Sequence, residues 1–381
     1  MKGKWEPIQD DEPKVPIPDN YTALLTKILG RLNICSKEEI VRRYDHEVQA
    51  RTIVKPFMGV SNDGPSDAAV LKPVYTSWEG LSVSHGMCPR FSDIDTYAMA
   101  ANSIDEAVRN AVCVGANPDY MAGLDNFSWA MGFSEEDEIR YTGLLVRANK
   151  AVYDVTTAYK VPLISGKDSM RNDYRIGEDT VSVPPTLMFS VIGKLPDIRK
   201  SITMDVKDEG DLVYILGVTK DELGASEYFD ELGFIGTNVP QVDTQSAFIR
   251  YRKLYNVIQQ DLVKSAHDCS DGGIGVALAE SSFSGGMGMD IDLRRVPVEK
   301  VTRDDFLLFS ESASRIILTV SSTNKEQFEK MMEGTSFAQI GVVKGKNLKI
   351  SGIEGKVIID APNSELKRSW QKTFEFLAWR E

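Results

Sequence analysis

One short segment of the chain combines a flexible backbone, a cation, a carboxylate and a hydroxyl, which are groups that hold phosphate. Residues 161–164 form an apolar run that predicts a buried strand, and residues 165–169 predict a polar turn at its end. Such a turn suits a phosphate-bearing ligand, because its backbone is flexible and Lys167 supplies positive charge. It is not a Walker A loop, because no glycine precedes Gly166 at the required spacing and Asp168 replaces the hydroxyl. A plain polar turn explains the same residues equally well.

A carboxylate and an amide stand four residues apart in a second segment. The spacing of apolar residues predicts a helix over 96–114, which places Glu106 and Asn110 on one face. A carboxylate and an amide oxygen at that spacing can share one magnesium ion. A solvated helix face is the alternative, because Asn102, Asp105 and Arg109 are polar as well.

A third segment, residues 267–273 (His-Asp-Cys-Ser-Asp-Gly-Gly), opens a predicted helix over 274–283. Asp271 before two glycines is a natural N-cap, which alone accounts for it. The double glycine also lets a ligand approach the N–H groups that begin the helix. Asp268 and Asp271 beside Ser270 supply more acid than one cap requires, so a metal or nucleotide role stays open.

Isolated acids and histidines complete the candidate residues. Asp67 stands before a predicted strand and Asp125 ends another, so each is either a turn carboxylate or a ligand. His85 has no acidic partner nearby in the sequence, which favours a structural or peripheral binding role. The sequence yields no nucleophile–base–acid set.

The composition bounds the classes of protein. The 381 residues, 42% hydrophobic and 26% charged, are typical of a soluble globular chain of two or three domains. A net charge of −12 argues against nucleic-acid and anionic-membrane surfaces. No apolar run approaches the roughly 20 residues that cross a bilayer, and the N-terminus is not a secretory signal. The four cysteines are far apart, which favours a reducing cytoplasm over disulfides or a zinc site.

Strands alternate with long helices along the chain. Residues 1–19 carry four prolines and predict an extended arm, and a break near 197–210 predicts a domain boundary. The fold class is therefore α/β or α+β in two domains. Strands are predicted at 68–74, 80–83, 187–192, 212–218, 316–320 and 338–343, and helices at 134–159 and 245–264.

Nine segments, taken in order, closely resemble the C-terminal half of the synthetase region of phosphoribosylformylglycinamidine synthase, in the aminoimidazole ribonucleotide synthetase superfamily. They span roughly residues 20–345. The matching segments are Tyr44-Asp-His-Glu-Val-Gln49, Asp67-Ala-Ala-Val70, Ser92-Asp-Ile-Asp95, Asp105-Glu-Ala-Val-Arg-Asn110, Leu124-Asp-Asn-Phe127, Ser165-Gly-Lys-Asp-Ser169, Val183-Pro-Pro-Thr186, His267-Asp-Cys-Ser-Asp-Gly-Gly273 and Phe309-Ser-Glu-Ser312.

The resemblance implies a fold and an activity. The fold would have an N-terminal A domain (20–200), whose sheet forms a dimeric barrel, and a C-terminal B domain (201–381). The activity would be that of a C–N ligase of de novo purine biosynthesis, which uses ATP and Mg²⁺ to convert formylglycinamide ribonucleotide to its amidine. Ammonia would come from a glutaminase subunit. The physical logic is activation of a poor leaving group while magnesium screens the phosphates.

Two sets of residues carry over by resemblance. Asp67, Glu106, Asn110 and Asp268 match magnesium ligands of an auxiliary, non-catalytic nucleotide site, and Ser270 matches a nucleotide contact there. Asp125, Gly166 and Lys167 match nucleotide-binding positions, and Ser169 a substrate-binding position, that this half lends to the catalytic site. Lys167 stands where many members carry an asparagine that binds magnesium. A charged lysine cannot do so, and is expected to meet phosphate instead.

The departures from the family limit the expected activity. We find no match to the first half's catalytic histidine segment and no glutaminase domain, so the chain is expected to need a first-half partner. An isolated unit would leave an apolar sheet bare, which predicts a homodimer. Two alternatives stay open: a non-catalytic nucleotide-binding or assembly subunit of a purine complex, and a homodimeric ATP-dependent enzyme acting on another substrate.

Overall fold

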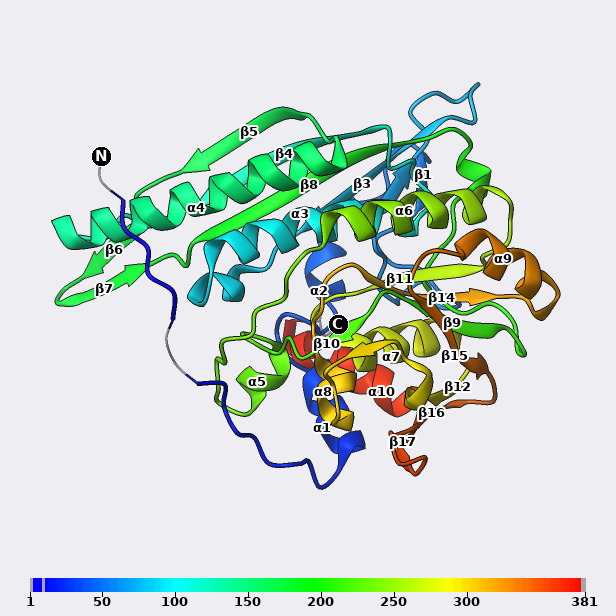
Figure 1. The fold of residues 1–381 in the computed structure, drawn as a ribbon. Helices are drawn as coiled ribbons and strands as arrows, with labels where there is room; N and C mark the ends of the chain where they lie inside the picture. Colours follow the sequence, from blue (N-terminus) through cyan, green and yellow to red (C-terminus); the bar gives the residue numbers. More distant parts are fainter. Residues whose placement is uncertain (1–2, 9–10, 378–381) are drawn as a thin grey trace.

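Within residues 3–8 and 11–377, which the structure describes, the chain folds into two large β-sheets with helices packed against them (Figure 1). The structure is a computed structural model. The order of the six-stranded sheet is β1 (Thr52–Val54), β2 (Ala69–Leu71), β3 (Gly80–Gly86), β8 (Thr186–Leu195), β4 (Met121–Ser128) and β5 (Leu163–Ser169). The order of the seven-stranded sheet is β11 (Ser265–Cys269), β14 (Arg315–Val320), β9 (Leu212–Leu216), β15 (Phe337–Val343), β12 (Met289–Asp292), β16 (Asn347–Ser351) and β17 (Val357–Pro362).

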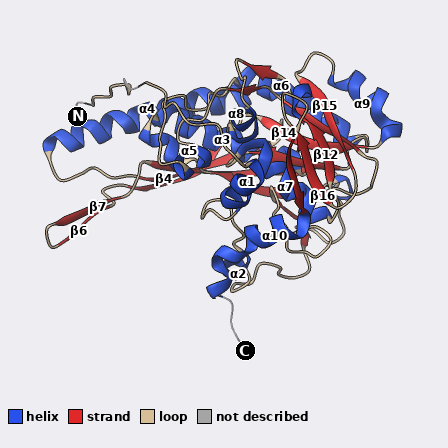
Figure 2. Ribbon diagram, turned by 90° about the horizontal axis from the view of Figure 1, so that it is seen from below, coloured by secondary structure: helices blue, strands red, loops and turns tan. Residues whose placement is uncertain are grey.

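Helices and two small strand pairs complete the fold (Figure 2). The strand pairs are β6 (Asp173–Ile176) with β7 (Asp179–Ser182), and β10 (Thr219–Lys220) with β13 (Val298–Glu299). The α-helices are α1 (Tyr21–Leu29), α2 (Glu38–Val41), α3 (Thr96–Cys113), α4 (Glu135–Tyr159), α5 (Glu227–Glu231), α6 (Thr244–Gln259), α7 (Gly273–Gly285), α8 (Asp304–Phe309), α9 (Lys325–Met332) and α10 (Asn363–Gln371). The 3₁₀ turns are η1 (Pro89–Asp93), η2 (Ile198–Lys200), η3 (Leu293–Arg295), η4 (Ser322–Asn324) and η5 (Lys372–Leu377).

The first sheet has one covered face. Helix α3 packs on β3 and β8, and α4 packs on α3. Along β3, Ser82 and Ser84 face the helix and are buried, whereas Leu81 and Val83 face outward and are 36% and 42% exposed. This inverts the usual arrangement, in which the apolar side chains of a one-sided sheet face the core. Ile192 pairs with Val83 across β3 and β8 and is also 42% exposed, so the outer face carries bare apolar side chains.

The second sheet is buried on both faces along β11, β14 and β9. Val213 and Ile215 of β9 belong to a core shared with α1, α7 and α10, while Tyr214 and Leu216 belong to a core shared with α6 and α9. The latter core continues into α3 and the first sheet, so α3 and α6 lie between the two sheets. Helix α3, almost wholly buried, contacts β3 on one side and β11 on the other. Most of the predicted metal ligands lie on these elements: Glu106 and Asn110 on α3, and Asp268 on β11.

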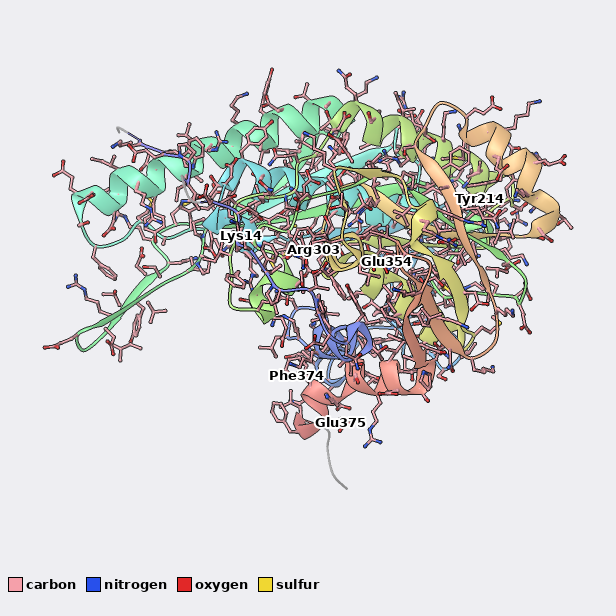
Figure 3. All side chains as sticks on the ribbon, turned by 60° about the horizontal axis from the view of Figure 1, so that its bottom comes forward. Lys14, Tyr214, Arg303, Glu354, Phe374 and Glu375 are labelled. Atoms are coloured by element: carbon pink, nitrogen blue, oxygen red, sulfur yellow. The ribbon has the colours of Figure 1, made fainter. Side chains whose placement is uncertain are left out.

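In its described residues, 3–8 and 11–19, the N-terminal arm contacts both halves of the molecule and contains neither helix nor strand. The Lys4 N–H donates to the Ile139 carbonyl of α4 (3.2 Å). Farther along, Glu12 accepts hydrogen bonds from the Thr237 backbone and hydroxyl (both 2.6 Å). Arg303, labelled with Lys14 in Figure 3, donates to the Val15 carbonyl (2.9 Å). Helix α1, which follows the arm, packs on α7, α10 and β17. The predicted division at residues 200 and 201 stays a prediction.

Most predicted elements are confirmed within a few residues, including α3, α4, α6, β8, β9, β14 and β15. The prediction around residues 161–169 is wrong in two respects. The strand begins at Leu163 and continues through the segment predicted as a turn, ending at Ser169, and it is exposed rather than buried. The reason is its place at the sheet edge, next to β4 alone, where Leu163 and Ile164 are 44% and 63% exposed. None of the described helices is long and apolar enough to span a membrane.

Candidate metal and nucleotide site

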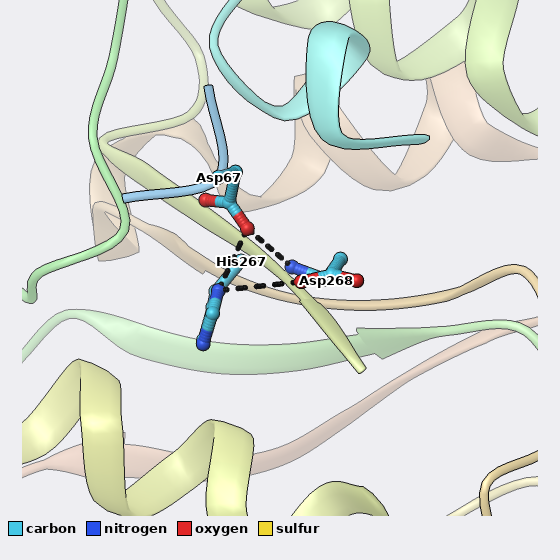
Figure 4. A group of neighbouring side chains, drawn as sticks. All are labelled: Asp67, His267 and Asp268. Carbon is cyan, nitrogen blue, oxygen red and sulfur yellow. Dashed lines mark hydrogen bonds and ion pairs between the residues drawn. The ribbon is translucent and has the colours of Figure 1, made fainter. Parts of the chain in front are cut away.

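Asp67, His267 and Asp268 meet where β2 and β11 approach each other (Figure 4). Asp67 lies just before β2, and the other two lie within the buried strand β11, before its last residue Cys269. Oδ1 of Asp67 is 2.8 Å from Nδ1 of His267 and accepts the Asp268 N–H at 3.1 Å. One ligand atom from each residue lies within 4.8 Å of the others. Nε2 of His267 is 2.8 Å from Oε2 of Glu280, so carboxylates hold the imidazole on both sides.

Two buried oxygens of the predicted metal ligands lack a hydrogen-bond partner. Among the described residues, Oδ2 of Asp67 and Oδ1 of Asn110 have no hydrogen-bond donor. The Asn110 amide nitrogen donates to the His85 carbonyl (3.1 Å), which fixes the amide and leaves its oxygen unpaired. Buried oxygens without partners are costly in a folded protein, and hard divalent cations bind oxygens of these types. The residues present therefore fit a magnesium ion.

The pKa values of the neighbouring carboxylates also favour a bound cation. Burial, with the charges of Asp268 and Asp271, raises the pKa of Glu106 to about 8. Burial also raises the pKa of Asp67 to about 6, and burial with the charge of Glu227 raises that of Asp271 to about 7. In Asp268, Arg109 and His267 outweigh burial and lower the pKa. Crowded carboxylates with raised pKa values gain most from a nearby cation, because the cation favours their charged forms.

A cavity of about 300 Å³ opens beside Glu106. Its wall combines carboxylates, which suit cations, with Lys37 and Arg90, which suit phosphate, and with apolar side chains. Glu311 accepts the backbone N–H groups of Glu227 (2.9 Å) and Gly272 (2.8 Å), and burial raises its pKa well above the ordinary range. The cavity-lining residues are Leu32, Asn33, Lys37, His85, Met87, Cys88, Pro89, Arg90, Phe91, Glu106, Ala225, Glu227, Asp271 and Glu311.

The expected capping role of Asp271 is not what the structure shows. Gly272 is the N-cap of α7, and no side chain caps the helix. Gly272 and Gly273 have φ of +75° and +64°, and a Cβ at Gly273 would collide with the Ser310 carbonyl. The left-handed glycines start the helix by themselves. The Asp271 side chain instead lines the cavity.

The second predicted set lies along the β4–β5 pair, where the strands run parallel. Asp125 pairs with Gly166, and a Cβ at residue 166 would collide with Oδ1 of Asp125. The Lys167 ammonium contacts the Ser169 hydroxyl, two residues along the same strand. Burial, with the charge of Asp168, raises the pKa of Asp125. Gly166 and Lys167 are exposed at the sheet edge.

The structure thus gathers the predicted residues into two groups. Asp67 and Asp268 touch directly, and Glu106 and Asn110 are one turn apart on α3, facing β3 through Met87 and His85. Ser270 lies in the loop between β11 and α7, where its carbonyl accepts the Gly273 N–H (2.9 Å). No hydrogen bond or ion pair among the described residues joins this group to the β4–β5 set.

Sequence reasoning assigned no role to several residues of the cavity. Lys37, Arg90 and Glu227 are separated by long stretches of chain, and no spacing pattern connects them. For Glu311 a signal existed, because the motif Phe309-Ser-Glu-Ser312 contributed to the resemblance.

Comparison with known proteins bears on both halves of the chain. Residues 208–352 match the family described as AIR synthase related protein, C-terminal domain. The phosphoribosylformylglycinamidine synthase subunit PurL of Methanocaldococcus jannaschii is 35% identical over 370 residues, covering 96% of this chain and 48% of that protein. PurL of Deinococcus radiodurans is 32% identical, covering 94% and 47%. The chain is homologous to PurL. The resemblance inferred from the motifs is confirmed, and the chain spans about half the length of the curated relatives it matches.

Solved structures share the fold. PurL of Thermotoga maritima, complexed with FGAR, superposes with a TM-score of 0.68 at 16% identity, covering 91% of this chain and 53% of that chain. The AaThiL protein, complexed with AMPPCP and TMP, gives a TM-score of 0.52 at 15% identity, covering 76% and 88%. The mixed α/β fold class expected from the sequence is confirmed as that of the AIR synthase-like proteins.

Proposed function

We propose that the chain is a half or subunit of a phosphoribosylformylglycinamidine synthase, an ATP-dependent C–N ligase of purine biosynthesis. The observation that carries the proposal is the homology to PurL over 96% of the chain. It is joined by an acidic cavity to which the matching motifs contribute Glu106, Asp271 and Glu311. The chain covers 48% of that relative, and we propose that the complete activity also uses the other half of a PurL protein. A cytoplasmic location suits its four free thiols.

We assign Asp67, Glu106, Asn110 and Asp268 to a magnesium site and Ser270 to nucleotide contact. The unpaired oxygens of Asp67 and Asn110 support this assignment. Bound magnesium would screen the phosphates of ATP or ADP. The cations Lys37 and Arg90 on the cavity wall add charge for the same phosphates.

We assign the β4–β5 set to a catalytic site completed by the partner. Asp125, Gly166 and Lys167 would contact ATP, and Ser169 would contact formylglycinamide ribonucleotide. The exposure of β5 supports this, because a shared site must be open toward the second subunit. Ammonia would come from a separate glutaminase subunit, and a T. maritima structure described as PurLQS contains a PurL-like chain of this fold.

The bare sheet face supports a proposal about where a partner binds. Leu81, Val83 and Ile192 are exposed side by side on the outer face of the first sheet. Burying them would contribute about 1–2 kcal/mol each. We propose that this face pairs with the first-half subunit or, when the chain is alone, with a second copy. Light scattering of Ile192→Asp against the unchanged chain tests it: a homodimer should become a monomer, and a monomeric unchanged chain would contradict the proposal.

Reconstitution tests the proposed activity. The chain is mixed with a separately expressed first half of a PurL protein, formylglycinamide ribonucleotide, ATP, Mg²⁺ and ammonium, and the amidine product is measured. The proposal expects product only when both halves are present. Lys167→Ala and Ser169→Ala should each lower the rate. A first half that is fully active without this chain would contradict the proposal.

A non-catalytic nucleotide-binding or assembly subunit is the second candidate. It is favoured by one observation: Glu106, Asp271 and Glu311 already come together in an acidic cavity, whereas the β4–β5 set lies open at an edge. In that case reconstitution would not depend on Lys167 or Ser169. A homodimeric enzyme acting on another substrate would instead turn over ATP without a first half.

A further inference from the structure

A buried carboxylate lies between the two sheets and connects helices from both halves of the chain. Asp105, on α3, is 0% exposed. Its side chain accepts hydrogen bonds from Arg109 of α3, Tyr159 at the end of α4, Tyr251 of α6 and Ser314 before β14. The Arg109 and Tyr251 bonds are both 2.6 Å, and the Ser314 hydroxyl lies 3.0 Å from each carboxylate oxygen.

Arg109 links this carboxylate to the candidate metal site. One end of its guanidinium binds Asp105, while Nε and Nη2 bind Oδ2 of Asp268 at 3.3 and 3.0 Å. The bonds from Arg109 therefore occupy one oxygen of Asp268 only. The other oxygen, Oδ1, lies 3.7 Å from Nδ1 of His267, on the side of Asp67.

Burial and neighbouring charges determine which groups of this arrangement are protonated. Arg109 is buried between two carboxylates, and although burial opposes its charge, Asp268 and Asp105 hold its pKa well above the ordinary range. Burial and Asp105 raise the pKa of Tyr159 and of Tyr251 far above neutrality. Both tyrosines therefore keep their protons and can donate to Asp105. The orientation of Arg109 then depends on where those hydroxyls hold Asp105.

We propose that Asp105, with Tyr159, Tyr251 and Ser314, is a positioning network that fixes Arg109 and so presents Oδ1 of Asp268 to a divalent cation. This inference rests on the proposed function, because it deepens the magnesium site assigned there. None of the network residues is among those assigned to bind the nucleotide or the metal. They act through Arg109, as carboxylates that orient metal ligands commonly do.

The test removes one hydroxyl at a time and measures metal binding directly. Mn²⁺, titrated into the chain and followed by electron paramagnetic resonance, reports the site without any need for turnover. Tyr251→Phe should raise the Mn²⁺ dissociation constant about tenfold, as for other residues that orient ligands. Ser314→Ala should also raise the Mn²⁺ dissociation constant. This second variant tests the network if Tyr251→Phe does not fold.

Tyr214→Phe is the matched control (Figure 3). Tyr214 is also 0% exposed and donates to a carboxylate, Glu329 of α9, at 2.8 Å. Neither β9 nor α9 contributes a residue to the candidate site. This variant should lose a similar amount of thermal stability without any change in Mn²⁺ affinity. The control thus distinguishes a general loss of stability from a loss of ligand positioning. Excess Mn²⁺ should restore saturation in Tyr251→Phe.

The outcomes separate the inference from the proposed function. Unchanged Mn²⁺ affinity in both Tyr251→Phe and Ser314→Ala, with a normal affinity in the parent chain, overturns the network and leaves the metal site standing. Equal losses in Tyr251→Phe and Tyr214→Phe overturn it as well. No Mn²⁺ binding by the parent chain overturns the network together with the magnesium site. Mn²⁺ binding without ADP binding would contradict the nucleotide assignment alone.

Discussion

Replacing Glu106 with glutamine should stabilise the metal-free protein while removing a magnesium ligand. The raised pKa of Glu106, about 8, means that the folded state holds a proton which the unfolded chain releases near its ordinary value of 4.5. The folded state therefore binds more protons over that interval. The contribution of Glu106 to the free energy of unfolding is greatest below pH 4.5 and is lost as the pH rises toward 8.

The magnitude follows from the same shift. Between pH 5 and 7 each pH unit should cost the parent chain roughly 1.4 kcal/mol through this one group, or about 3 kcal/mol over the interval. Glu106→Gln cannot titrate there. The free-energy difference between variant and parent should thus grow in favour of the variant by about 3 kcal/mol between pH 5 and 7. Urea unfolding in chelator at pH 5, 6 and 7 measures it.

Glu136→Gln, at an exposed position on the first turn of α4, is the control and should show no such trend. Saturating Mg²⁺ should reverse the advantage, because the metal binds the ionised carboxylate of the parent chain and finds no charge in the variant. A free-energy difference that stays flat with pH, or moves in favour of the parent chain, would refute the electrostatic reasoning about the cavity.

Three further predictions test other parts of the structure. Asp173→Ala removes the acceptor for two backbone N–H groups ahead of α4 and for the Ser182 hydroxyl. The free energy of urea unfolding should therefore fall by about 1–3 kcal/mol. Unchanged stability would contradict the anchoring of the β6–β7 hairpin. Glu12→Ala removes the bonds to Thr237, so limited proteolysis should cut the N-terminal arm faster than in the parent chain; equal rates would show that this contact does not hold the arm. Lys167→Ala should leave Mg²⁺-dependent ADP affinity unchanged while lowering reconstituted activity, and parallel loss of both would contradict the separation of the two sets.

Elements with a strong local pattern could be predicted from the sequence. The apolar faces of residues 96–114 and 134–159 predicted α3 and α4. Strand β5 was mispredicted because Ser165–Ser169 contains the residues of a turn, and only pairing with β4 extends it. The local sequence does not indicate which strand a segment will pair with.

The site was predictable as motifs but not as an arrangement. Glu106 and Asn110 could be paired because helix geometry fixes their spacing. The contact of Asp67 with Asp268 joins residues 201 positions apart, and it depends on how β2 and β11 approach each other. The mistaken cap at Asp271 has a similar origin. Two glycines with positive φ start α7 without any side chain, which leaves the carboxylate for the cavity.

Calorimetric titration of the purified chain with ADP, in the presence and absence of Mg²⁺, tests the central claim most directly. The account predicts binding at one site per chain that requires Mg²⁺ and that is weakened in Asp67→Ala and in Asp268→Ala. Nucleotide binding that is equally strong without Mg²⁺, or that is unchanged in both variants, would contradict the assignment of the acidic cavity as a magnesium–nucleotide site.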